Sequence, residues 1–121
     1  MCTQVYLDDE NKSRVVQLIL TKRTEAAFEL LSTLYRIKKP KLRVGTVKGH
    51  RRTALAVYVK KNNTIYASTS VMMFNPFVML HEFYHHIRSR SGVHKGTEKF
   101  ADTFAKDFLK AYVKYTTQHE L

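Results

Sequence analysis

Residues 78–87 read VMLHEFYHHI and place ionisable side chains inside an otherwise apolar segment. His81, Glu82 and His85 spell the pattern H-E-x-x-H. Residues four apart share one face of a helix, so both imidazoles can reach a single metal ion. Glu82 is rotated about 100° from His81, which places its carboxylate beside the ion rather than on it. The pattern predicts a metal site in which Glu82 takes a proton from water.

A second segment offers the remaining groups of such a site. A catalytic zinc ion needs a third protein ligand and keeps its fourth position open for water or substrate. Residues 97–109 read TEKFADTFAKDFL, in which Glu98 and Asp102 are four apart and share a helix face. Glu98 can complete a His₂Glu ligand set, and Asp102 can accept the far N–H of a ligand histidine. The alternative is a solvated helix start, because acids favour helix N-termini.

Other readings of the same residues stay open. His81 and His85 could form a buried polar face without metal, and two histidines with one carboxylate can also hold non-haem iron. The glutamate directly after His81 favours hydrolysis over oxygen chemistry. His86 is about 100° round the helix from His85, so we expect it to point away and pack. His94, in the connecting loop, could help catalysis or replace Glu98 as third ligand.

The ends of the chain hold further groups that could enter a zinc site. His119, Glu120 and the terminal carboxylate could occupy the open position, which would make the chain latent through its C-terminal tail. Cys2 could do the same from the other end. The alternative for the tail is a frayed terminus.

Length and composition restrict the class of protein. The 121 residues suffice for one compact domain, 1–121, and Cys2 as sole cysteine fits a reducing compartment. The first residues lack the features of a signal peptide, and no apolar run approaches the roughly 18 residues of a membrane span. We expect a soluble, cytoplasmic protein without a membrane anchor. Its oligomeric state is not predicted.

The charge is strongly basic. The formal net charge is +11, from 21 Lys+Arg against 10 Asp+Glu. Many of the basic residues cluster between 38 and 61, namely Lys38, Lys39, Lys41, Arg43, Lys48, Arg51, Arg52, Lys60 and Lys61. This fits a well-solvated Lys-rich surface. It also fits a non-catalytic or regulatory domain that binds nucleic acid or an acidic protein partner, although no nucleic-acid motif accompanies the charge.

The elements that would position the site follow from apolar spacing. Residues 13–37 predict a long N-terminal helix, with Ser13 as its N-cap and 21–24 as the place for a break. Three β-rich runs then predict a small twisted three-stranded sheet, at 41–47, 53–60 and 64–70.

Composition also suggests how the strands are arranged. The run 53–60 is nearly continuous in apolar residues, as a central strand would be. The more polar run 64–70 is expected at an edge. Between them, 61–63 read Lys-Asn-Asn, which predicts a tight hairpin turn because asparagine tolerates positive φ.

Two helices complete the predicted fold. Asn75-Pro76 predicts the start of an active-site helix that runs to about Arg90. Thr97 is the expected N-cap of a glutamate helix over about 98–115, with an apolar face of Phe100, Ala101, Phe104, Ala105, Phe108 and Leu109. The fold class is α+β, in the order α-β-β-β-α-α.

At this point the sequence resembles known metallopeptidases. HEFYH followed by EKFAD resembles the HExxH…ExxxD signature of gluzincins, and the short chain resembles their smallest members, the minigluzincins. LHEFYHHI followed by EKFADTFAKDFL is also similar to the ImmA/IrrE-like metallopeptidases. The resemblance is close over 75–110 and extends further only as element order. It implies a minimal zincin-like fold and a zinc-dependent endopeptidase.

Carried over residue by residue, the resemblance implies His81, His85 and Glu98 as zinc ligands. It implies Glu82 as general base and acid, and Asp102 as the partner of His81.

The resemblance also bears on the substrate. It implies that an extended peptide or protein substrate pairs with the edge strand, expected at about 64–70. Larger gluzincins carry an additional His or Tyr that stabilises the oxyanion, and Tyr112 lies about 21 Å along the helix from Glu98, too far to serve. A metzincin is excluded, because Arg88 and Ser91 stand where its glycine and third ligand belong.

Overall fold

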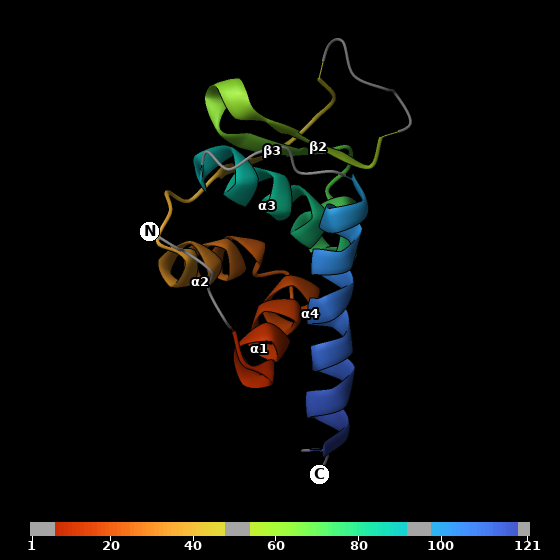
Figure 1. Ribbon diagram of the computed structural model, residues 1–121. Coiled ribbons are helices and arrows are strands. Elements are labelled where there is room, and N and C mark those ends of the chain that lie inside the picture. Colours follow the sequence, from red (N-terminus) through yellow and green to blue (C-terminus); the bar gives the residue numbers. More distant parts are fainter. Residues whose placement is uncertain (1–6, 48–53, 92–97, 119–121) are drawn as a thin grey trace.

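The computed structural model describes residues 7–47, 54–91 and 98–118 (Figure 1). Two helices come first, α1 (Asp9–Leu20) and α2 (Thr24–Tyr35). Three short strands follow, β1 (Lys41–Val44), β2 (Ala56–Val59) and β3 (Thr64–Ala67). The longer helices α3 (Pro76–Ser91) and α4 (Glu98–Gln118) come last, and 3₁₀ turns occupy Lys60–Asn62 and Val71–Phe74. The fold is α+β, as predicted.

The predicted long N-terminal helix is two helices. Lys22 adopts a left-handed conformation (φ 67°), and the N–H of Arg23 donates to the carbonyl of Leu18 at 2.7 Å, which closes α1. The predicted break near 21–24 is therefore confirmed. Ser13 is not the N-cap, because it lies buried within α1; Asp8 caps the helix instead, accepting from the N–H of Asn11 at 2.9 Å.

The strand order corrects two predictions. The sheet runs β1-β3-β2, with β3 parallel to β1 and antiparallel to β2. Residues 64–67 are therefore the central strand and 56–59 an edge strand, the reverse of what composition suggested. Neighbours on both sides bury even the short side chains Thr64 and Ala67, so the central strand needs no continuous apolar run.

The described helices all lie on one side of the sheet in Figure 1. The strand register places Leu42, Ile65 and Tyr58 in one row, and Leu42 and Ile65 are buried in the core. Because side chains alternate between the faces of a strand, this row faces the helices. The core continues through Phe28 and Phe83, whose ring centroids lie 5.2 Å apart and join α2 to α3.

The two C-terminal helices carry the predicted site residues, in the middle of α3 and at the start of α4. Asn75 caps α3 by accepting from the N–H of Val78 at 3.1 Å, and Pro76 occupies the first helical position, as predicted. On α4, Ala101 and Phe108 are buried, but Phe100 is 56% exposed and does not belong to the predicted apolar face. Thr97, the predicted cap, lies outside the described residues. No described helix is both long and apolar enough to cross a membrane.

Candidate metal and catalytic site

Three side chains from two helices converge on one point. Helix α3 presents His81 and His85 one turn apart, and the first turn of α4 supplies Glu98. One ligand atom from each residue lies within 4.8 Å of the others. Nε2 of His81 is 2.7 Å from Oε1 of Glu98, and Nε2 of His85 is 3.1 Å from Oε2 of the same carboxylate. The structure thus brings the predicted ligand set together.

The donor set fits a divalent ion such as zinc. Two imidazole nitrogens and one carboxylate oxygen form a known catalytic zinc ligand set. Tetrahedral bonds of about 2.0–2.2 Å separate ligand atoms by roughly 3.4 Å. The two contacts of Glu98 are slightly shorter than this separation, so its carboxylate would have to withdraw slightly. Its side chain is 79% exposed, which leaves it room to do so.

Asp102 orients the first histidine. Its Oδ1 lies 2.9 Å from Nδ1 of His81, one helical turn beyond Glu98. A carboxylate accepts hydrogen bonds, so Asp102 favours a proton on Nδ1 of His81. With an ion in the site, Nε2, which here faces Glu98, would be the nitrogen that binds it. This is the role that the sequence suggested for Asp102.

We expect Asp102→Asn to lower zinc affinity about 10- to 100-fold, because an amide holds the imidazole without the charge that raises its basicity. Competition with a chromophoric chelator measures the affinity. Asp107→Asn, an exposed change on the same helix, is the matched control and should bind zinc as the parent does. Equal affinities for both variants would remove Asp102 from the site.

Glu82 lies beside the ligands and is largely shielded from water. Its Oε2 is 3.9 Å from Nε2 of His81, and its side chain is 13% exposed. Burial raises the pKa of Glu82 to about 7; the charge of His81 lowers it, that of Glu98 raises it, and a hydrogen bond from the backbone N–H of Tyr58 lowers it. A carboxyl with a pKa near neutrality is suited to accept and return a proton.

The histidines after Glu82 play different parts. Burial lowers the pKa of His85, although the nearby charge of Glu98 acts in the opposite direction. The lowered pKa favours the neutral imidazole, which is the form that binds metals. His86 is fully buried, and its Nε2 donates to the carbonyl of Lys38 at 2.7 Å. Its Nδ1 accepts from the hydroxyl of Tyr58 at 2.9 Å. His86 is therefore a packed imidazole that points away from the cluster, as predicted.

Tyr58 connects the sheet to α3. Its hydroxyl contacts His86 and Ser89 on α3, the latter at 3.0 Å, while its backbone N–H bonds Glu82. Sequence reasoning missed this residue. The predicted hairpin paired its strand with 64–70, but only the strand order shows that β2 borders the site.

A cleft runs along β2 on both sides of the cluster. One hollow of about 410 Å³ is lined by Ala56, Val57, Tyr58, Lys60, Glu82, His85, Ser89 and Glu98. The other, about 480 Å³, is lined by Ala54, Leu55, Ala56, Phe77, Val78, His81, Glu82, Glu98 and Asp102. Ala56, Glu82 and Glu98 line both, so an extended chain could lie across the cluster.

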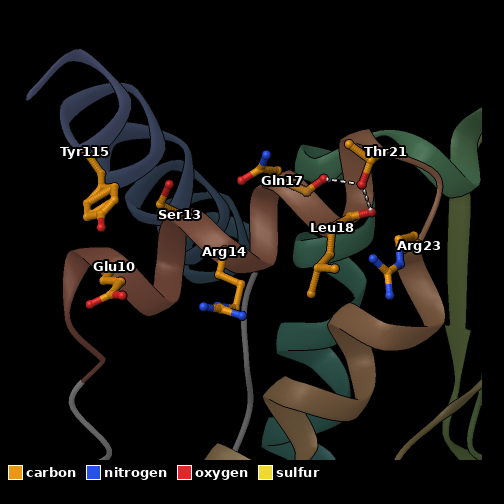
Figure 2. Close-up of a pocket in the computed structure, with 8 residues that line it drawn as sticks. All are labelled: Glu10, Ser13, Arg14, Gln17, Leu18, Thr21, Arg23 and Tyr115. Carbon is orange, nitrogen blue, oxygen red and sulfur yellow. Dashed lines mark hydrogen bonds between the residues drawn. The ribbon is translucent and has the colours of Figure 1, made fainter. Parts of the chain in front are cut away.

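A hollow of about 540 Å³ lies elsewhere, on α1 (Figure 2). It is lined by Glu10, Ser13, Arg14, Gln17, Leu18, Thr21, Arg23 and Tyr115. The hydroxyl of Thr21 is directed at its own helix, donating to the carbonyl of Gln17 at 2.8 Å. Among the residues that the structure describes, the group His81, His85 and Glu98 alone has metal-binding geometry. The hollow on α1 therefore offers no comparable centre.

Four other predicted participants, Cys2, His94, His119 and Glu120, lie outside the described residues.

Comparisons with protein-family models, curated proteins and solved structures found no match for this chain. The resemblance to gluzincins and ImmA/IrrE-like metallopeptidases therefore stays a prediction from 75–110. The case for a function depends on the geometry of the cluster and of the cleft beside it.

Proposed function

We propose that this protein is a zinc-dependent metallopeptidase that hydrolyses peptide bonds in an extended substrate. One observation carries the proposal: His81, His85 and Glu98 direct ligand atoms at one point, within 4.8 Å of one another. Glu82 lies next to them and is shielded from water. A metal ligand set with an acid–base group beside it is the minimal equipment for hydrolysis by activated water.

The chemistry divides between the ion and the chain. When bound, zinc would polarise the substrate carbonyl and lower the pKa of water toward about 7. Asp102 holds His81 in the tautomer that binds metal. Glu82 accepts the proton of the attacking water and passes it to the leaving amine. The raised pKa of Glu82 supports this role, because a base with a pKa near neutrality can give the proton back.

In the part of the chain that the structure describes, β2 pairs only with β3, and we propose its other edge as the place for the substrate backbone. The carbonyl of Leu55 accepts from the N–H of Ser68 at 2.9 Å, so Leu55 and Val57 bond toward β3. By the alternation of antiparallel ladders, Ala56 and Tyr58 direct their backbone groups outward, toward the cleft. A peptide pairing with Ala56 would lie across the cluster. This replaces the edge expected at 64–70.

Metal analysis tests the proposal. We expect the purified chain to bind one zinc ion and to cleave a fluorogenic peptide library. Losing a residue that hydrogen-bonds a metal ligand typically weakens metal binding about 10- to 100-fold. Glu98 is itself a proposed ligand, so we expect Glu98→Ala to weaken zinc binding by more than this. Glu29→Ala, an exposed change on α2, is the control and should bind zinc as the parent does.

The outcomes separate the alternatives. A metal-free chain that stays empty in excess zinc would remove the proposal. Zinc binding without any peptide hydrolysis would leave a non-catalytic metal domain. Preferential binding of ferrous iron at the same residues would favour oxygen chemistry.

A further inference from the structure

The positive charge of the chain is concentrated in one continuous segment. Residues 30–81 contain no Asp or Glu and ten basic residues, namely Arg36, Lys38, Lys39, Lys41, Arg43, Lys48, Arg51, Arg52, Lys60 and Lys61. The other 69 residues hold the remaining 11 Lys+Arg and all 10 acids, a net charge of +1. All three strands lie in the acid-free segment. The segment that contains the sheet therefore carries +10 of the net charge of +11, and Lys41 and Arg43 lie on the strands themselves.

The sheet has a face that the described helices do not cover. One row of the register consists of Arg43, Tyr66 and Val57, offset by one residue from the row that faces the core. Side chains alternate between faces, so this row points away from the helices, which all lie on the other side in Figure 1. Lys41, two residues before Arg43, joins the same face, and both are exposed. We call Lys41, Arg43, Val57 and Tyr66 the outer face.

Local hydrogen bonds fix the main groups of this face. The side-chain amide of Asn62 donates to the hydroxyl of Tyr66 at 2.9 Å, which holds the ring in the centre of the sheet. Nη1 of Arg43 donates to the carbonyl of Leu42 at 3.0 Å, which uses one of five guanidinium donors. The face thus presents an aromatic ring beside an oriented cation.

The cations of this face have no acidic partner within the described structure. Lys39 shows the contrast, because its Nζ is 2.8 Å from Glu25 of α2. Across residues 7–47, 54–91 and 98–118, no carboxylate lies within 4.0 Å of the charged groups of Lys41, Arg43, Lys60 or Lys61. Their charge is available to an anionic ligand.

We propose that the outer face binds single-stranded nucleic acid, with a base stacked on Tyr66. Lys41 and Arg43 would contact phosphates, and Lys60 and Lys61 in the adjoining turn would extend the positive field. Positive charge that follows a backbone, combined with an aromatic stacking group, is how single strands are bound without sequence preference. An acidic protein would need the cations but not the ring, so Tyr66 distinguishes the two partners. The proposal does not depend on the peptidase activity.

Fluorescence anisotropy of the full chain with a labelled 15-nucleotide single strand tests the proposal. We expect binding that weakens with salt, with a slope of about −0.7 per phosphate contact. Tyr66→Ala should weaken binding about 5- to 150-fold, the loss of one stacked base. Lys41→Glu/Arg43→Glu should weaken binding and flatten the salt slope. Lys106→Glu/Lys110→Glu, exposed on α4, makes the same change in net charge and should bind nearly as the parent does.

Several results would overturn the proposal. One is the absence of binding at about 50 mM salt, where contacts to phosphate are only weakly screened. Another is an equal loss in the two double variants, which would mean that net charge alone matters. Two further results would point to an acidic protein partner instead. In one, poly-glutamate displaces the labelled strand as strongly as unlabelled oligonucleotide does. In the other, a folded Tyr66→Ala variant binds the strand as tightly as the parent does. If that variant fails to fold, the two double variants still decide.

Discussion

Replacing Glu82 by glutamine is expected to abolish peptide hydrolysis and to leave zinc binding intact. Glutamine has nearly the same shape and can still accept the N–H of Tyr58, but it cannot take a proton from water. Loss of a positioned general base typically costs about 10²- to 10⁴-fold in rate. Initial rates on a cleaved peptide, measured beside zinc stoichiometry, check both halves of the expectation.

The control for this experiment must separate chemistry from structure. Glu29→Gln makes the same chemical change on an exposed position of α2 and should keep parental activity. Circular dichroism shows whether the Glu82→Gln chain is folded. A folded, zinc-loaded Glu82→Gln chain with undiminished activity would defeat the assignment of Glu82 as the base.

Replacing Phe83 by alanine is expected to destabilise the fold by about 3–5 kcal/mol. Phe83 is fully buried on α3, with its ring centroid 5.2 Å from that of Phe28 and 5.5 Å from that of His86. Its removal would leave a cavity between α2 and α3, on the helix that carries His81 and His85. Urea unfolding followed by circular dichroism measures the loss.

The matched control for Phe83 is Phe100, which has the same side chain but is 56% exposed. Phe100→Ala should change the free energy of unfolding by no more than about 0.5 kcal/mol, as surface substitutions usually do. A loss for Phe83→Ala as small as this would mean that the packing between α2 and α3 contributes little.

The ligand cluster could be predicted because its geometry is local. His81 and His85 are four apart on one helix, and the same spacing relates Glu98 and Asp102 on another, so helix geometry alone aligns each pair. Only one part of the prediction depended on segments far apart in the chain, namely that α3 packs against α4. Apolar faces on both helices predict that contact, since each face must be buried.

The strand order could not be predicted, because it depends on contacts between segments far apart in the chain. Apolar content suggested that 53–60 was central, but β2 is apolar because one face packs on α3 and its edge borders the cleft. The polar side chains of the run 64–70 suggested an edge, yet β3 lies between two neighbouring strands, and Thr64 and Ala67 are buried. The contact from Tyr58 to Glu82 depends on this order and was missed with it.

The ligands come from two helices that the chain joins only through residues 92–97. An ion bound by His81, His85 and Glu98 would therefore act as a cross-link that is present in the native state and absent from the unfolded one. Binding at a hundred times the dissociation constant adds about 2.7 kcal/mol to native stability. The melting temperature of this protein would then follow the free zinc level, and a chelator would loosen the start of α4 before it affected the core.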